Sequence, residues 1–152
     1  MDYLLLDTCI VLHILRNNEL SERSKQAIRD FSESPAIVWS VVTMGEIEAL
    51  KVQHNWGEPR IKALNTFFEG ISFIDITHTD NELIEAYARI DAYSKRKATD
   101  RFGNYLDDTH KTMHKNDLWI AATAFVLDIP LLTSDGDFDH LNGTLLNVMK
   151  VV

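Results

Sequence analysis

The sequence predicts an α/β fold in which a central, mostly parallel sheet of four to five strands is flanked by helices. Short apolar runs recur along the chain, and segments with helical spacing of apolar residues separate them. The runs are nearly continuous in hydrophobicity, as in strands that are buried on both faces. Strands that alternate with helices are typical of a parallel sheet covered on both sides. A length of 152 residues favours a single domain, 1–152.

The first half of the chain contains two strands and four helical segments in this interpretation. Each strand is an apolar run too short for a helix, and each helix carries apolar residues three or four positions apart. Pro59 marks the start of the fourth helix and Gly70 its end. The expected elements are a strand at 3–6, a helix from Ile10, a polar stretch at 17–24 leading into a helix around 27–31, a strand at 36–40, and helices at 43–52 and 59–70.

The second half continues the alternation but includes one irregular segment. We expect strands at 71–76, 130–133 and 145–151, and helices at 81–94 and from Asp117 onward. The last helix is apolar nearly all round, which indicates that it is buried on most sides. Residues 94–116 are polar, mixed in charge and poorly periodic, so they form either an extended helical arm or a loop.

Composition excludes several classes of protein. Charged residues make up 25% and hydrophobic residues 45% of the chain, which argues against disorder. A single cysteine permits no intrachain disulfide and fits a reducing cytosol, so we expect a cytoplasmic protein. The beginning, MDYLLLDTC, resembles neither a signal peptide nor a membrane span, so no membrane partner is expected. A net charge of −8 argues against tight non-specific binding of nucleic acid, unless the acids are concentrated in one cleft.

Four aspartates each have an ordinary structural interpretation when considered alone. Asp7 is a favourable N-cap for the first helix. Asp117 is suited to the cap or first turn of the last helix. Asp135 and Asp137 are typical turn residues.

Considered together, the same acids indicate a metal site. The carboxyl ends of parallel strands meet at one edge of the sheet, and Asp7 and Asp135 follow two such ends. With Asp117 close by, their carboxylates would repel one another unless a cation lay between them. Oxygen ligands without cysteine or paired histidine favour Mg²⁺ or Mn²⁺ over Zn²⁺. Such an ion suits metal-assisted hydrolysis of a phosphodiester.

Four segments resemble, in chain order, the four motifs of the PIN domain family, and the VapC-type ribonuclease toxins of toxin–antitoxin pairs in particular. The segments are LLLDTCIVL, MGEIEAL, KNDLWIAATA and LLTSDGDF. The resemblance covers nearly the whole chain. It implies a three-layer fold around a parallel sheet and an endoribonuclease that depends on Mg²⁺ or Mn²⁺.

The resemblance also assigns roles to individual residues. The catalytic acids that it implies are Asp7, Glu46, Asp117 and Asp135. The metal ligands that it implies are Asp7, Asp117 and Asp135, with Asp137 as a further candidate, and Thr133 supports the site. Periodicity alone does not decide between Glu46 and Glu48, and the resemblance favours Glu46.

The implied partners are an RNA substrate, a cognate antitoxin protein and a second copy of the chain in a homodimer. The segment 94–116 is longer than the usual connection in compact toxins. Its basic residues are candidates for phosphate contacts, although a solvated helix face explains them equally well. They are Lys95, Arg96, Lys97, Arg101, Lys111 and Lys115.

Two further functions remain open at this stage. One is a housekeeping PIN nuclease that processes RNA or acts on DNA, and the other is a non-catalytic PIN-fold module that binds a partner. The presence of all the acids disfavours the second. Cys9 has no identifiable base to activate it, so we expect a buried or half-buried small residue there rather than a nucleophile.

Overall fold

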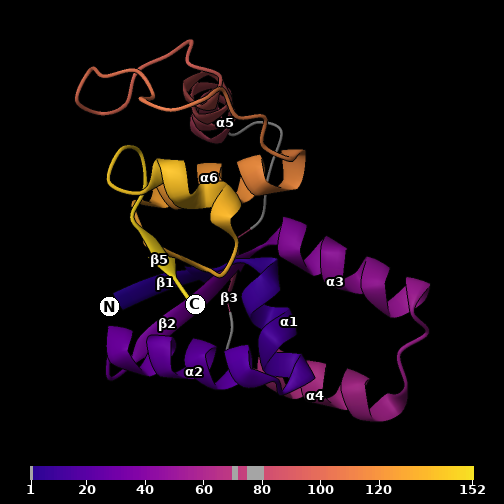
Figure 1. Ribbon diagram of the computed structural model, residues 1–152. Helices are drawn as coiled ribbons and strands as arrows, with labels where there is room; N and C mark the ends of the chain where they lie inside the picture. The colour runs from indigo at the N-terminus through magenta and orange to yellow at the C-terminus, as the bar shows by residue number, and fades with distance from the viewer. Residues whose placement is uncertain (1, 70–71, 75–80) are drawn as a thin grey trace.

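The computed structural model describes residues 2–69, 72–74 and 81–152, and within these ranges the chain alternates strands and helices (Figure 1). The strands are β1 (Asp2–Leu6), β2 (Pro35–Ser40), β3 (Ser72–Ile74), β4 (Leu131–Thr133) and β5 (Val148–Lys150). The helices are α1 (Thr8–Arg16), α2 (Glu19–Phe31), α3 (Val41–Gln53), α4 (Glu58–Phe68), α5 (Asn81–Ser94), α6 (Lys115–Leu127) and the 3₁₀ helix η1 (Gly136–Leu141).

The described strands form one five-stranded sheet in the order β3-β2-β1-β4-β5, and all neighbouring pairs are parallel. This confirms the predicted α/β class. The chain passes from β1 to one side of the sheet to form β2, and it later returns to the other side to form β4. The order therefore reverses next to β1, and in open parallel sheets such a reversal leaves a crevice at the carboxyl ends of the strands.

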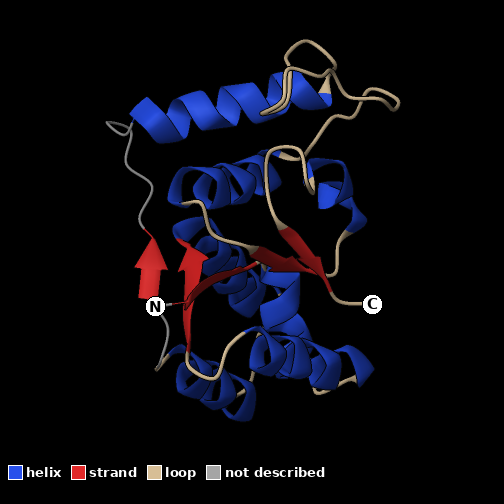
Figure 2. Cartoon of the chain, turned by 90° about the vertical axis from the view of Figure 1, so that its left-hand side faces the viewer, coloured by secondary structure: helices blue, strands red, loops and turns tan. Residues whose placement is uncertain are grey.

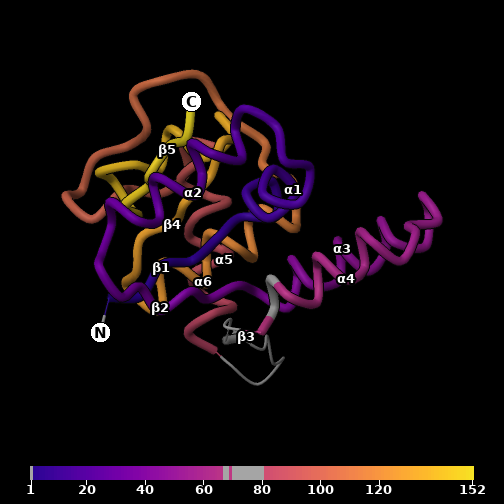
Figure 3. The backbone as a smooth tube through the Cα atoms, turned by 90° about the horizontal axis from the view of Figure 1, so that it is seen from below, coloured from indigo at the N-terminus to yellow at the C-terminus, as the bar shows by residue number. Residues whose placement is uncertain are grey.

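Helices cover both faces of the sheet (Figure 2). In β1, Leu5 belongs to the core cluster shared with α5 and α6, whereas Leu4 and Leu6 belong to the cluster shared with α1 and α4. This alternation follows from the two-residue period of a strand, and all three leucines are fully buried. Figures 1 and 3 show α3 and α4 extending to the same side, away from the sheet.

Several boundaries differ from the prediction for local reasons. Helix α2 begins at Glu19, within the polar stretch that was expected to precede the helix, because the side chain of Asn18 caps it at the nitrogen of Ser21. Strand β5 is shorter than predicted, because Leu145 and Leu146 donate backbone hydrogen bonds to Leu141 in a turn.

Two other predicted features are settled only in part. Residues 95–114 form an irregular loop between α5 and α6. Gly70 and the ends of the strand predicted at 71–76 lie outside the described residues. None of the described helices has both the length and the hydrophobicity needed to span a membrane.

Candidate active site

Asp7 lies at the carboxyl end of β1 and has both of the interpretations that the sequence left open. Its Oδ1 accepts a hydrogen bond of 2.8 Å from the backbone nitrogen of Thr8, so it caps α1. Its Oδ2 accepts from Thr133 Oγ1 at 2.8 Å and from Cys9 Sγ at 3.1 Å. Only 4% of Asp7 is exposed. Asp7 can therefore cap α1 and also belong to the crevice at the end of β1.

The surroundings of Asp7 influence the protonation of both Asp7 and Cys9. Burial raises the pKa of Asp7, and the hydrogen bonds from Thr133, Cys9 and Thr8 oppose that shift. Burial, with the charge of Asp7, raises the pKa of Cys9 to about 11. The thiol is thus protonated at neutral pH and donates to Asp7, which is not the state of a reactive cysteine.

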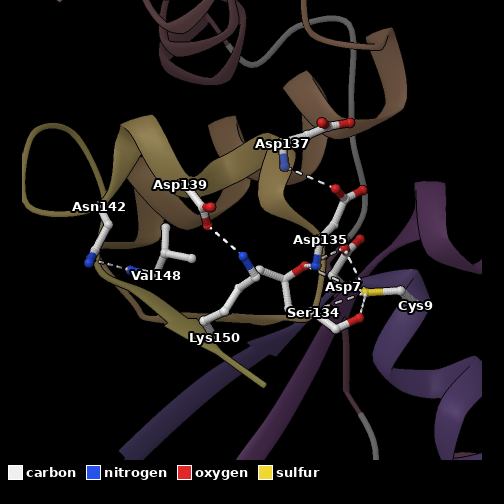
Figure 4. Close-up of polar contacts among 10 residues, drawn as sticks. Asp7, Cys9, Ser134, Asp135, Asp137, Asp139, Asn142, Val148 and Lys150 are labelled. Atoms are coloured by element: carbon white, nitrogen blue, oxygen red, sulfur yellow. Dashed lines mark hydrogen bonds and ion pairs between the residues drawn. The ribbon is translucent and has the colours of Figure 1, made fainter. Parts of the chain in front are cut away.

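Asp117, Asp135 and Asp137 come from two distant segments and converge. Each offers a carboxylate oxygen, and these oxygens lie within 4.8 Å of one another. Asp117 belongs to the first turn of α6, and Asp135 is the N-cap of η1, where it accepts from the nitrogen of Asp137 at 2.9 Å. Figure 4 shows Asp7 beside Asp135, and the hydrogen bond from the nitrogen of Asp137 to the Asp135 carboxylate.

The electrostatics of this group favour a cation. Burial, followed by the charges of Asp7, Asp135, Glu46 and Asp137, raises the pKa of Asp117 to about 7. A raised pKa means that the ionised form of Asp117 is disfavoured next to the other carboxylates.

Glu46 on α3 faces this cluster, whereas Glu48 does not. Thr8 Oγ1 donates to Glu46 Oε1 at 2.9 Å. Burial raises the pKa of Glu46, the hydrogen bonds from Thr8 and Asn116 lower it, and the charge of Asp7 raises it. Glu48 is exposed and lies 3.0 Å from Lys51. The two glutamates are two positions apart, so a helix directs them to different sides.

The donor set fits a hard divalent cation. The converging atoms are carboxylate oxygens, which Mg²⁺ and Mn²⁺ prefer, and the neighbouring thiol is protonated. A cation among Asp117, Asp135 and Asp137 would relieve their repulsion.

Comparison with protein families identifies the domain. The model of the PIN domain matches residues 4–143, a range that includes every acid described above. The chain belongs to the PIN domain family. No curated protein sequence matches the chain closely enough to count as a relative.

Several solved structures have a similar fold. The PIN domain described here is similar to a chain of VapBC2 from Rickettsia felis bound to a promoter DNA fragment, with a TM-score of 0.72, 16% identity, and 96% and 98% of the two chains covered. It is also similar to a chain of DNA-bound VapBC from Salmonella typhimurium, with a TM-score of 0.69, 16% identity and full coverage of both chains. VapC20 from Mycobacterium tuberculosis has a TM-score of 0.62 and 14% identity, with 91% and 95% covered. At these identities the similarity concerns the fold.

Sequence reasoning missed several residues that support the acids of this PIN domain. Thr8 lies between Asp7 and Glu46, and its Oγ1 is 3.1 Å from Thr43 Oγ1. Asn116 is a hydrogen-bond partner of Glu46. Two features of the sequence could have indicated these residues. Thr8 directly follows Asp7, and Thr43 precedes Glu46 by three positions, which places Thr43 and Glu46 on one face of α3.

The basic residues predicted to contact RNA do not form a single surface beside the acids. Lys115 shares an open cleft of about 640 Å³ with Glu46 and Asp117. Arg101 instead lies 3.6 Å from Asp128, the C-cap of α6, at the opposite end of that helix from Asp117.

The remaining basic residues divide according to their partners. Lys95 lies 3.0 Å from Asp91, and Lys111 lies 3.4 Å from Asp108. Arg96 and Lys97 are exposed at the end of α5.

Thr133 connects Asp7 and Asp135, and its removal should weaken the fold. Its hydroxyl donates to Asp7 and accepts from the nitrogen of Asp135 at 3.0 Å, and the side chain is fully buried. We expect Thr133→Val to lower the free energy of unfolding by about 1–3 kcal/mol, because it removes the buried hydroxyl that bonds to Asp7 and to the nitrogen of Asp135. Urea unfolding measures this, with Thr133→Ser as the control that keeps the hydroxyl. Equal stability of the Val variant and the wild type would contradict the role given to Thr133.

Proposed function

We propose that this PIN domain is an endoribonuclease that depends on Mg²⁺ or Mn²⁺ and acts as the toxin of a toxin–antitoxin pair. The observation that carries the proposal is the convergence of Asp117, Asp135 and Asp137 in a crevice beside Asp7. Family membership supports a nuclease. Support for the toxin comes from the similar fold of VapC20, which is described as a toxin that cleaves the sarcin–ricin loop.

The side chains divide the chemical work in this proposal. Asp117, Asp135 and Asp137 would hold the metal, together with Asp7, whose charge acts on Asp117. A bound divalent ion would supply charge neutralisation at the phosphate and a water of lowered pKa. Glu46 orients the attacking water and accepts its proton, since a carboxylate with a raised pKa is a stronger base than usual. Thr8 and Asn116 hold Glu46 in place for this step.

The charge of the molecule is compatible with an RNA substrate once the site is considered separately. Without Asp7, Glu46, Asp117, Asp135 and Asp137, 18 acidic residues remain against 15 basic residues. A bound divalent ion would offset part of the negative charge of the crevice and offer a positive centre to phosphate oxygens.

An antitoxin and a second copy of the chain are the proposed protein partners. Several solved structures of similar fold are VapBC complexes, and one of them is described as a member of a family of toxin–antitoxin systems. A C-terminal antitoxin segment that places a basic side chain among the acids would compete with the metal and the RNA. A small neighbouring gene for a DNA-binding antitoxin would distinguish this toxin from a housekeeping nuclease of the same family.

The decisive test of the activity is cleavage of single-stranded RNA by the purified chain. We expect products with Mn²⁺ or Mg²⁺ and none when the metal is chelated. Cleavage that continues undiminished in excess chelator would contradict the proposal.

The two glutamates of α3 provide a matched pair of variants. We expect Glu46→Gln to lower kcat roughly a hundredfold to ten-thousandfold, because it removes the proton acceptor. Glu48→Gln should retain wild-type activity, because Glu48 is exposed and paired with Lys51. Single-turnover RNA cleavage measures both, and equal losses in the two variants would argue against the role of Glu46.

A further inference from the structure

Helix α5 ends in a Schellman motif whose critical position is occupied by an arginine. The nitrogen of Lys97 donates to the carbonyl of Ala92 at 2.8 Å, and the nitrogen of Arg96 donates to the carbonyl of Tyr93 at 3.0 Å. This pattern places Arg96 at the left-handed position, where its φ is 63°. Glycine is the usual residue there, because the Cβ of an L-residue is crowded in this conformation.

Arg96 is unusual among the left-handed residues of the described chain. The other non-glycine residues with positive φ are Asn17, Asn55 and Asp128. Asparagine and aspartate tolerate this conformation, because their short side chains bond to the local backbone. Backbone geometry therefore does not explain an arginine at position 96, whereas a contact of its side chain would.

Arg96 and Lys97 differ from the other three lysine and arginine residues of the loop 95–114, which are paired with carboxylates. Lys95, Arg101 and Lys111 each lie within 3.6 Å of a carboxylate oxygen. For Arg96, no ion pair is found within residues 2–69, 72–74 and 81–152. Arg96 instead lines an open pocket of about 630 Å³ with Tyr105. Its guanidinium is therefore available to a phosphate from outside the chain.

Tyr105 presents an aromatic ring to the same pocket. Tyr105 is 59% exposed. The turn that precedes it is nevertheless fixed by hydrogen bonds. Asp100 Oδ1 accepts from the nitrogens of Phe102 and Asn104 at 2.8 Å and 3.0 Å, and the nitrogen of Asp100 donates to the carbonyl of Asn104 at 2.8 Å. An exposed aromatic side chain on an ordered turn is a suitable surface for stacking a base.

The pocket lies next to the acidic crevice. His140 lines the pocket, and Asp137 of the acidic cluster precedes it by three residues in η1. In a 3₁₀ helix residues three apart share a face, about 6 Å from each other along the axis. Ser94 Oγ contacts His140 Nε2 at 2.7 Å and Met113 Sδ at 3.4 Å, and Met113 lines the cleft that holds Asp117. Ser94 thus contacts one residue that lines the pocket and one that lines the cleft.

We infer that this pocket binds a nucleotide of single-stranded RNA next to the cleaved bond, with its base on Tyr105 and its phosphate on Arg96. The inference rests on the proposed ribonuclease function and adds a subsite to it. Asp107 and Asn104 also line the pocket and offer an acceptor and a donor to base edges. A structural alternative is that Arg96 only answers the partial negative charge at the end of α5.

The exchange of Arg96 for glycine separates these two explanations. Binding of a fluorescein-labelled single-stranded oligoribonucleotide is measured by anisotropy over a range of KCl, in an Asp117→Asn background that prevents cleavage. We expect Arg96→Gly to weaken binding roughly tenfold and to reduce the salt slope by about 0.7, the value for one phosphate contact. Its unfolding midpoint in urea should equal or exceed that of the parent. Lys97→Ala is the control, because it removes one positive charge from a neighbouring residue that does not line the pocket. It should weaken RNA binding less than Arg96→Gly.

Variants of Tyr105 test the inference independently in the same RNA-binding assay. We expect Tyr105→Ala to weaken binding roughly 5- to 100-fold, as for the loss of one stacked base. Tyr105→Phe should bind like the parent, because it keeps the ring.

The possible outcomes distinguish the inference from the proposed function. RNA affinity that is unchanged in both Arg96→Gly and Tyr105→Ala would overturn the inference and leave the pocket to a protein partner. A loss of stability in Arg96→Gly with unchanged RNA binding would overturn it in favour of the helix-end explanation. Metal-dependent cleavage by the wild type, measured in parallel, tests the proposed function. Its absence would overturn both.

Discussion

Replacing Asp7 with Asn is expected to reduce metal-dependent RNA cleavage by more than about a hundredfold. The carboxylate lies at the end of β1 within the acidic crevice, and its charge raises the pKa of Asp117. Loss of that charge weakens the attraction for a divalent ion, which supplies several kcal/mol of transition-state stabilisation in enzymes of this kind. The assay compares initial rates of RNA cleavage at saturating Mn²⁺.

A matched aspartate controls for the general effect of removing a charge. Asp139 is exposed, belongs to the same 3₁₀ helix as Asp137, and lies 2.8 Å from Lys150. We expect Asp139→Asn to cleave RNA at the wild-type rate, since surface ion pairs contribute little to stability. A thermal melt establishes that Asp7→Asn is folded. If the folded Asp7→Asn variant is as active as the wild type, Asp7 is not part of the site.

In the absence of metal, Asp117→Asn is expected to be at least as stable as the wild type. The pKa of Asp117 is raised to about 7 in the folded chain by burial and by its acidic neighbours. The folded state therefore binds a proton more tightly than the unfolded state, and this contribution to stability is lost as the pH rises from about 4 to about 7. Asn removes the penalty. Allowing for partial exposure, we expect a gain of about 1–2 kcal/mol at pH 8 and almost none at pH 4.

The measurement is urea unfolding in chelator at several pH values, followed by the same series with Mn²⁺. Metal should stabilise the wild type by mass action and have little effect on Asp117→Asn. A clear destabilisation of Asp117→Asn in chelator at pH 8 would indicate that Asp117 serves mainly the first turn of α6.

The hydrophobic pattern predicted most of the fold, and the errors occurred where hydrogen bonds of caps and turns determine structure. The helix at 81–94 was predicted with its observed ends, because apolar residues such as Leu83 and Ile90 follow one face and are buried. The start of α2 was missed, because a capping asparagine and an exposed polar face carry no hydrophobic signal. The end of the chain contains a turn at Leu145 whose apolar residues resemble those of a strand.

The site was predictable to the extent that topology determines it. Parallel strands bring Asp7 and Asp135 to one edge, so their proximity follows from the predicted order of elements. The choice of Glu46 over Glu48 required the resemblance to the PIN domain family, because both residues flank the apolar arc of α3. Thr8 shows the limit of periodicity, since its contact with Glu46 depends on how α1 packs against α3.

The pocket at the end of α5 was not predictable from the pattern. A Schellman motif is normally recognised by its glycine, and here Arg96 occupies that position. The loop 95–114 has no periodicity, so the position of Tyr105 follows only from the hydrogen bonds of Asp100.

The central claim is that acids from separate segments of the chain together bind a divalent metal. Diffraction from crystals soaked in Mn²⁺, recorded where manganese scatters anomalously, tests this claim most directly. We predict an anomalous peak in contact with carboxylate oxygens of Asp117 and of Asp135 or Asp137, and its absence from Asp117→Asn crystals treated alike. A peak bound elsewhere on the molecule, with none among these three carboxylates, would contradict the account.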